Sequence, residues 1–160
     1  MKIFRVIAVG LMLAAPVQAQ TWEDGDAAYS AGDYVTALEN WRPLAEQGDA
    51  SAQFILGFMY YNGRGVPQDY AAAVRWYRMA AEQGYAWAQY DLGLMYENGR
   101  GAPQDYVTAH MWVNIGSANG NPVAAYVRDE VLVPNMTPAQ IAEAQRRARV
   151  CMESRYRDCY

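Results

Sequence analysis

Lysine is nearly absent from this chain of 160 residues, because Lys2 is the only one. A P-loop, a Schiff-base enzyme and a Ser-x-x-Lys acylation site each depend on a lysine side chain, so the sequence argues against all three. The other basic residues are arginines, and acidic residues outnumber basic ones by 17 to 13. Nucleic-acid binding needs a concentrated basic face, and the sequence therefore predicts no nucleic-acid partner.

Histidine and cysteine are also scarce. His110 is the only histidine, and the two cysteines, Cys151 and Cys159, lie far from it in the sequence. Two thiolates and one distant imidazole do not make a closed zinc site, so the sequence predicts no metal and no cofactor. As a catalytic base, His110 would need a nucleophile or a carboxylate within hydrogen-bond reach. We favour a packed or partly exposed helix residue, because His110 has the same repeat position as Val74.

The first 19 residues are typical of a secretory signal. Lys2 and Arg5 precede an apolar stretch of about ten residues, which is too short to span a bilayer as a helix. Pro16 follows, and small residues then lead to a predicted cleavage after Ala19. The alternative is an uncleaved membrane anchor. Cleavage would make the protein periplasmic or secreted, without stable membrane insertion, and would leave 11 arginines against 17 acids, a net charge near −6.

The cysteine pair fits this export prediction. In an oxidising compartment, an even number of cysteines is first interpreted as a disulfide, here between Cys151 and Cys159. Eight residues of continuous helix rise about 12 Å, whereas bridged Cα atoms lie roughly 4.4–6.8 Å apart. If the two pair within one chain, the helix must end between them, near residues 154–157. Pairing between two chains stays open at this stage.

A 36-residue repeat dominates the rest of the chain. Without a gap, about 21 of 36 positions are identical between residues 45–80 and residues 81–116. Each copy predicts two helices, which in the first of these copies run from about Ala50 to Tyr61 and from about Tyr70 to Gln83. A glycine- and proline-containing turn separates them, and Asp69 is the expected cap of the second helix. The pattern predicts an all-α repeat protein.

The C-terminal segment differs from the repeats. Thr137, Pro138 and Gln140 form a strong helix start, with a threonine cap, a proline in the first position and a glutamine three residues after the cap. We expect a polar capping helix to about Glu153, preceded by a linker at residues 131–135. The sequence thus divides into a signal at 1–19, repeats at 20–134, and a capping helix with a cysteine-containing tail at 135–160.

These repeats resemble the Sel1-like repeat family, which is related to the tetratricopeptide repeats. The resemblance is carried by small, aromatic and glycine positions, namely Ala52, Leu56, Gly57, Tyr60, Gly63, Gly65, Asp69, Ala73, Trp76, Tyr77, Ala80, Ala81 and Gly84, most of which recur 36 residues later. It implies an α/α superhelical solenoid, here of about three helix pairs with a C-terminal capping helix. It also implies first helices on the concave side and an adaptor role, in exported members within envelope signalling or host interaction.

The candidate partner-binding residues follow from this expectation. Interfaces favour aromatic and arginine side chains. The candidates on or beside the first helices are Tyr61, Trp87, Tyr90, Arg64 and Arg100. The competing interpretation is that most aromatic residues are core and that both arginines pair with a neighbouring acid, which we favour for the arginines. Tyr61 and Trp87 are the stronger pair, because Glu97 and Ser51 replace them in the other copy.

The function expected from the sequence is that of a non-catalytic interaction module, with a protein or peptide partner of unknown identity. Repeated acids such as Asp69 and Asp105 are expected to be helix caps rather than the unequal acid pair of a glycosidase. The alternative is a hydrolase of the β-lactamase-like, penicillin-binding type that some relatives resemble. That alternative is weak, because no lysine and no Ser-x-x-Lys follow the signal. The oligomeric state stays open.

Overall fold

The computed structural model describes residues 22–160, and the predicted signal lies outside them. Within this range the chain is helical, and no strand is present. The elements in order are α1 (Trp22–Ser30), α2 (Tyr34–Glu46), α3 (Ala50–Asn62), α4 (Tyr70–Ala81), α5 (Ala86–Asn98), α6 (Tyr106–Ala118), α7 (Ala124–Tyr126), the π-helical segment η1 (Val127–Leu132), the 3₁₀ turn η2 (Val133–Asn135) and α8 (Pro138–Glu153). None of these helices is long and apolar enough to cross a membrane.

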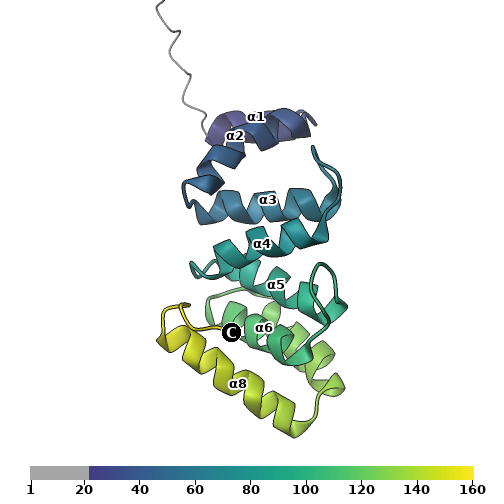
Figure 1. Ribbon diagram of the computed structural model, residues 1–160, viewed down its shortest axis with the longest axis vertical. Helices are drawn as coiled ribbons and strands as arrows, with labels where there is room; N and C mark the ends of the chain where they lie inside the picture. The colour runs from purple at the N-terminus through teal and green to yellow at the C-terminus, as the bar shows by residue number, and fades with distance from the viewer. Residues whose placement is uncertain (1–21) are drawn as a thin grey trace, which may run out of the picture.

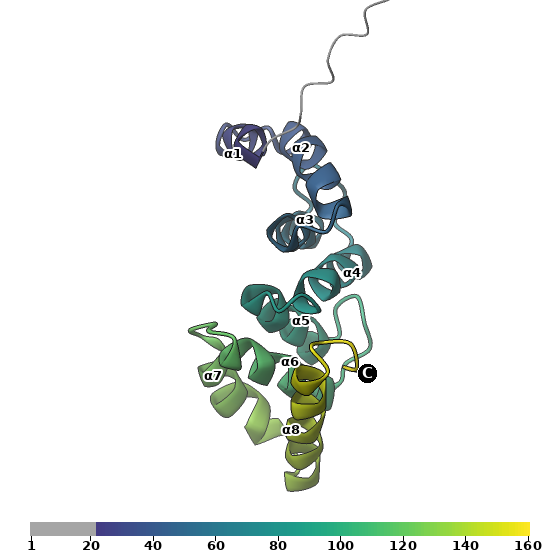
Figure 2. The same ribbon diagram turned by 90° about the vertical axis from the view of Figure 1, so that its left-hand side faces the viewer.

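The helices stack in antiparallel pairs along one axis (Figure 1). After a turn of 90°, the first helices α1, α3 and α5 lie on one side of a curved stack and the second helices α2, α4 and α6 on the other (Figure 2). The curve opens on the side of the first helices, which therefore line its concave face. This confirms the all-α solenoid expected from the repeat.

The helix starts follow the sequence closely. Asp33, Asp49, Asp69 and Asp105 each accept a hydrogen bond from a backbone N–H of the first turn of the helix that they precede. Thr137 and Gln140 form the reciprocal pair of bonds expected at the start of α8. The aspartates that recur every 36 residues thus cap the second helices, as expected from the sequence.

Close contact between the two helices of a pair depends on a glycine in the first one. A Cβ atom on Gly57 would lie 2.5 Å from the ring of Tyr77, and one on Gly93 would lie 2.5 Å from a methyl group of Val113. Gly25 lies against Trp41 in the same way. Because no side chain intervenes, the side chain of the second helix packs directly against the backbone of the first.

The two ends of the chain differ from the central copies. Helix α1 forms the first helix of the earliest pair, and its connection to α2 is shorter than the loops of later copies. The linker expected at residues 131–135 is wrong, because η1 and η2 continue α7 as helical turns up to Asn135. Together these turns take the place of a first helix beside α8.

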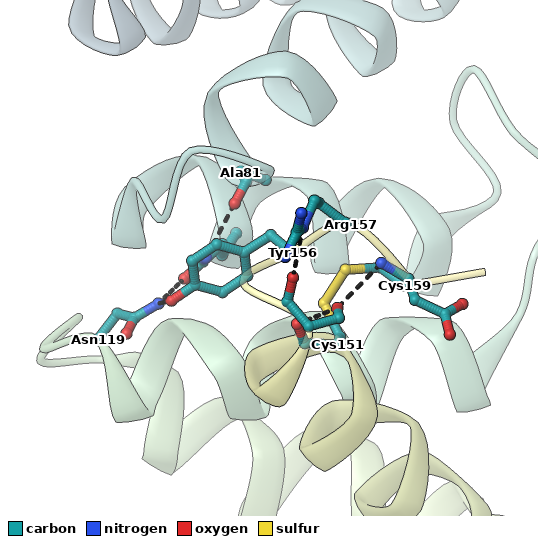
Figure 3. The surroundings of a disulfide bond; sticks show 9 residues. Ala81, Asn119, Cys151, Tyr156, Arg157 and Cys159 are labelled. Carbon is teal, nitrogen blue, oxygen red and sulfur yellow. Dashed lines mark hydrogen bonds between the residues drawn. A yellow bond between two sulfur atoms is a disulfide. The ribbon is translucent and has the colours of Figure 1, made fainter.

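The C-terminal tail folds back on the stack. Helix α8 ends at Glu153, and Arg155 and Tyr156 adopt positive φ, which brings the Cα atoms of Cys151 and Cys159 to 4.4 Å in a disulfide within one chain. The Tyr156 side chain points away from the disulfide, and its phenolic oxygen accepts a hydrogen bond from Asn119 at 2.8 Å (Figure 3). The bridge therefore holds a tail that contacts the loop after α6.

We expect Gly57→Ala to lower the free energy of unfolding by about 1–2 kcal/mol, although alanine favours an isolated helix, because the added methyl would overlap the Tyr77 ring. Urea denaturation measures this change. In the double variant with Tyr77→Ala, the total loss of stability should be smaller than the sum of the losses in the two single variants, because the added methyl group then enters the space that the ring has left. An unchanged midpoint in the single variant would show that the pair does not need the glycine.

We expect the oxidised protein to carry no free thiol, and replacement of both cysteines by serine to cost about 2.5 kcal/mol, as expected for closing a loop of this length. Thiol titration of protein purified from the export compartment and denaturation of the double variant measure the two quantities. Two free thiols in that protein would contradict the assignment.

Candidate functional site

The concave face contains a pocket of about 200 Å³ between α3 and α5. Helix α3 contributes Phe58 and Tyr61, and α5 contributes Asp91 and Leu94. The ring of Tyr77, from the second helix α4, completes the lining at the place where Gly57 lets it through. Asn62, Asn98, Met95 and Arg100 also line it. Mixed aromatic and polar walls of this kind suit a side chain of another molecule.

Helical spacing explains why these side chains converge. Tyr61 and Asn62 follow Phe58 by three and four residues, so both lie beside it on α3. The same spacing joins Asp91, Leu94 and Asn98 on α5. The two faces are turned toward the same pocket because the helices occupy equivalent places in successive repeats.

Asp91 is the electrostatic anomaly of this pocket. Its side chain is half-buried, and no described residue forms a hydrogen bond or an ion pair with its carboxylate. Burial raises the pKa of Asp91 to about 7. Burial and the nearby Asp91 charge also raise the pKa of the Tyr77 phenol, and they raise that of Tyr90 in the same way. A carboxyl group poised near neutral pH therefore lies among aromatic rings.

A second pocket, of about 290 Å³, lies one repeat earlier, between α1 and α3. Trp41, Ile55 and Phe58 line it, and these residues precede Tyr77, Asp91 and Leu94 of the first pocket by 36 positions each. Asp26, Tyr29 and Phe54 complete its lining. The two pockets are thus repeat equivalents that differ in charge at two places: Ile55 stands opposite Asp91, and the exposed Asp26 stands opposite Asn62.

The two loop arginines form repeated contacts within the stack. Arg64 donates a hydrogen bond to the Tyr29 hydroxyl, and its guanidinium carbon lies 5.3 Å from the centre of the Tyr34 ring. Arg100 donates to the Tyr61 hydroxyl and lies 5.6 Å from the centre of the Tyr70 ring. The sequence prediction that both arginines pair with an acidic neighbour is wrong, because tyrosines of the preceding repeat contact the two guanidinium groups instead.

Glycine explains how each arginine reaches this position. Gly65 and Gly101 have φ of 71° and 73°, and a Cβ atom on either would lie within 2.3 Å of a backbone carbonyl oxygen of the preceding second helix, that of Tyr34 or Tyr70. Only glycine allows both the left-handed backbone and this approach. The Gly-Arg-Gly turn is therefore a joint between repeats.

The other predicted residues lie at different distances from the pocket. Tyr61 forms part of its wall. Trp87 is 44% exposed and shares a face of α5 with Asp91, four residues later, so it extends the same surface. Tyr90 is half-buried against the core and does not line the pocket. As partner contacts, all five candidate residues stay predictions.

Asp91 was missed by the sequence analysis. The acids considered as candidates recur in each copy, whereas Asp91 stands where the preceding copy has Ile55. A charged residue in the position of an apolar one is the signal that would have found it.

His110 is buried, as a packed helix residue would be. Burial and the nearby Arg128 lower its pKa, and its Nδ1 atom has no hydrogen-bond partner. It lies beside a polar hollow of about 450 Å³ with Arg128, Asp129 and Arg149, where no serine, threonine or cysteine nucleophile is present. Over residues 22–160, no group of three or more histidine, cysteine or acidic residues could hold a metal ion.

A family model of the Sel1 repeat matches residues 50–85 and 88–121, which span α3–α4 and α5–α6. The chain belongs to the Sel1 repeat family. Sel1 repeats are protein-interaction repeats, and the described part of this Sel1 repeat protein is such a scaffold, with no catalytic domain beside it. No curated protein matches its sequence.

Solved structures of similar fold support the assignment. One is a protective antigen present in uropathogenic Escherichia coli strains, displaying an SLR fold, which is 29% identical with a TM-score of 0.76. The alignment covers 82% of this chain and 30% of that one. Another is a Sel1 repeat protein from Oxalobacter formigenes, 30% identical with a TM-score of 0.68, where the alignment covers 80% of this chain and 54% of the other. This chain therefore spans only about a third to a half of these relatives.

Asp91→Asn tests the buried carboxyl. The unfolded chain loses this proton near pH 4 and the folded protein near pH 7, so the folded state binds the extra proton between these values. The contribution of Asp91 to the free energy of unfolding is therefore lost as the pH rises through this interval. Asparagine does not titrate, so the variant shows no such loss. We expect the stability of the wild type relative to the variant to fall by on the order of 2 kcal/mol between pH 4 and pH 7, after allowance for remaining solvent contact. Urea denaturation at several pH values measures it, and a constant difference would contradict a raised pKa.

Proposed function

We propose that this Sel1 repeat protein is an exported adaptor that holds a segment of a partner protein in its concave groove. The observation that carries the proposal is the pocket between α3 and α5, where aromatic walls surround a carboxylate without a partner. The loop arginines pair with tyrosines of the stack, whereas the Asp91 carboxylate lines a pocket without a partner among the described residues. An unpaired group in a concave site is therefore better explained by a ligand.

The surface around the pocket supports the same proposal. Trp87 lies one turn before Asp91 on the same face of α5, and a tryptophan with 44% exposure is costly to leave in water. Tryptophan is also the residue type most enriched at interface hot spots. The stacked repeats present this surface already formed, so little conformational entropy would be lost when a partner binds.

Export is supported by two observations of different kinds. The disulfide between Cys151 and Cys159 is typical of oxidising compartments. A protein of similar fold is a protective antigen, which fits a location outside the cytoplasm. With the signal-like residues 1–19 of the sequence, these observations favour the periplasm or the cell exterior as the place where the partner is met.

A photo-crosslinking amino acid placed at one position at a time tests the groove in cells. The groove positions are Trp87 and Leu94, and the control position is Met79 on α4, which is 43% exposed but belongs to a helix on the opposite side of the stack. We expect one protein to be captured from both groove positions and not from Met79.

Capture of the same protein from Met79 with equal yield would show that the contact is not confined to the groove. No capture from any position would remove the adaptor proposal. The Gly57→Ala variant with a crosslinker at Leu94 gives a further check. Disturbed packing between α3 and α4 should lower the yield of the crosslinked partner while leaving the site of crosslinking unchanged.

A further inference from the structure

Asp91 is an energetic liability that the fold does not explain. A carboxylate at a half-buried position without a hydrogen bond or ion pair is unfavourable, and Ile55 shows that an apolar residue fits the equivalent place. The solenoid would thus be more stable with isoleucine at both positions. Retention of the acid points to a group from outside the described chain that pairs with it.

The walls around Asp91 indicate the charge of that group. Aromatic ring faces attract cations, and Phe58, Tyr61 and Tyr77 all line the pocket. Rings of this kind already hold cations in this protein, since the Arg100 guanidinium lies 5.7 Å from the centre of the Tyr61 ring. A carboxylate together with tyrosine and phenylalanine rings is a suitable environment for a lysine or arginine side chain.

We propose that the pocket between α3 and α5 receives a lysine or arginine side chain of the partner protein, and that the equivalent pocket between α1 and α3 receives an apolar side chain of the same segment. This inference rests on the proposed function, because both side chains belong to the segment held in the concave groove. The volume of about 200 Å³ suits one long side chain rather than a whole secondary-structure element.

Charge complementarity favours this occupant. The chain has a formal net charge of −4, and its acidic surface attracts basic segments over long distances. Arg100 at the pocket is the opposing local charge, and its contacts with Tyr61 and Tyr70 hold it in place. Replacement of Arg100 by glutamine should therefore strengthen the binding of a basic segment.

The second pocket gives the segment its direction. Ile55 and Trp41 stand where the first pocket has Asp91 and Tyr77, and the carboxylate that lines the second pocket, that of Asp26, is exposed to solvent rather than half-buried. A partner that places a basic side chain in one pocket and an apolar side chain in the other fits in one orientation only. If Asp91 and Ile55 were exchanged, the preference for a basic side chain should therefore move to the second pocket.

Selection from a random peptide library displayed on phage tests this pattern. The bait is the disulfide-intact protein in three forms: wild type, Asp91→Ile and Ile55→Asp. We expect wild-type binders to share one lysine or arginine, whose replacement by methionine lowers affinity at least about tenfold. Asp91→Ile should lose this preference and remain folded, because it copies the neighbouring repeat. Ile55→Asp should create a second basic preference.

The acidity of Asp91 provides an independent measurement on the selected peptide. A cation binds the ionised carboxylate, so affinity should rise several-fold from pH 6 to pH 8 in the wild type and stay constant in Asp91→Ile. The titratable and charged groups that line the pocket with Asp91 are Tyr61 on α3, Tyr77 on α4 and Arg100, and burial raises the pKa of Tyr77 further above this pH range.

Three outcomes would overturn the inference. If the peptides that bind the wild type share no basic residue, or bind Asp91→Ile with equal affinity, the inference of a basic side chain in the pocket is wrong. The proposal that the groove binds a partner would still stand. A failure of the wild type to select any peptide would reject both the groove and the inference. A concentration-dependent dimer that dissociates in Asp91→Ile would place an arginine of a second copy in the pocket instead of a partner protein.

Discussion

The contact between a glycine of each first helix and a large side chain of its second helix determines both the packing and the groove. Gly25 meets Trp41, Gly57 meets Tyr77, and Gly93 meets Val113. Without a Cβ atom on the glycine, the two helices approach closely and the side chain of the second helix packs directly against the first. Trp41 and Tyr77, although buried, also line the two pockets. Two of the residues that hold a pair together therefore also form part of a pocket wall.

Hydrogen bonds from polar side chains connect each pair to the next. Gln53 and Gln89 each donate 3.0 Å bonds to backbone oxygens of the preceding second helix. Arg42 and Arg78 donate to the hydroxyls of Tyr60 and Tyr96. Each bond recurs 36 residues later, so it serves the stack at every level. Asp91 lies outside this pattern, because no described residue forms a hydrogen bond or an ion pair with its carboxylate.

The sequence predicted the repeating part of the structure well. The identical positions of the two copies specify helix length, helix caps and turns through local chemistry, and Asp69 and Thr137 cap the helices as expected. The even pair of cysteines in an exported chain predicted a disulfide, and pairing within one chain required the helix to end between Cys151 and Cys159, as it does before Arg155 and Tyr156.

Features that depend on tertiary contact were not predicted. The tyrosine partners of Arg64 and Arg100 lie in the preceding repeat, more than 30 residues away in sequence, so no local pattern reveals them. The helical turns of η1 and η2 interrupt the regular helix, and a single copy of such a segment offers no repeat to compare. Asp91 could have been found from its mismatch with Ile55, but its lack of a partner is visible only when the surrounding helices are in place.

Differences between repeats, rather than their shared residues, carry the information about a partner. A residue that recurs at every level must satisfy the same contacts at every level, and it is therefore explained by the stack. Trp87 stands where the preceding copy has Ser51, and Asp91 stands where it has Ile55. Both lie on the same face of α5, four residues apart. Two departures from the repeat on one helical face are more simply explained by a single ligand than by two independent structural needs, and one of the two residues carries the charge that specifies it.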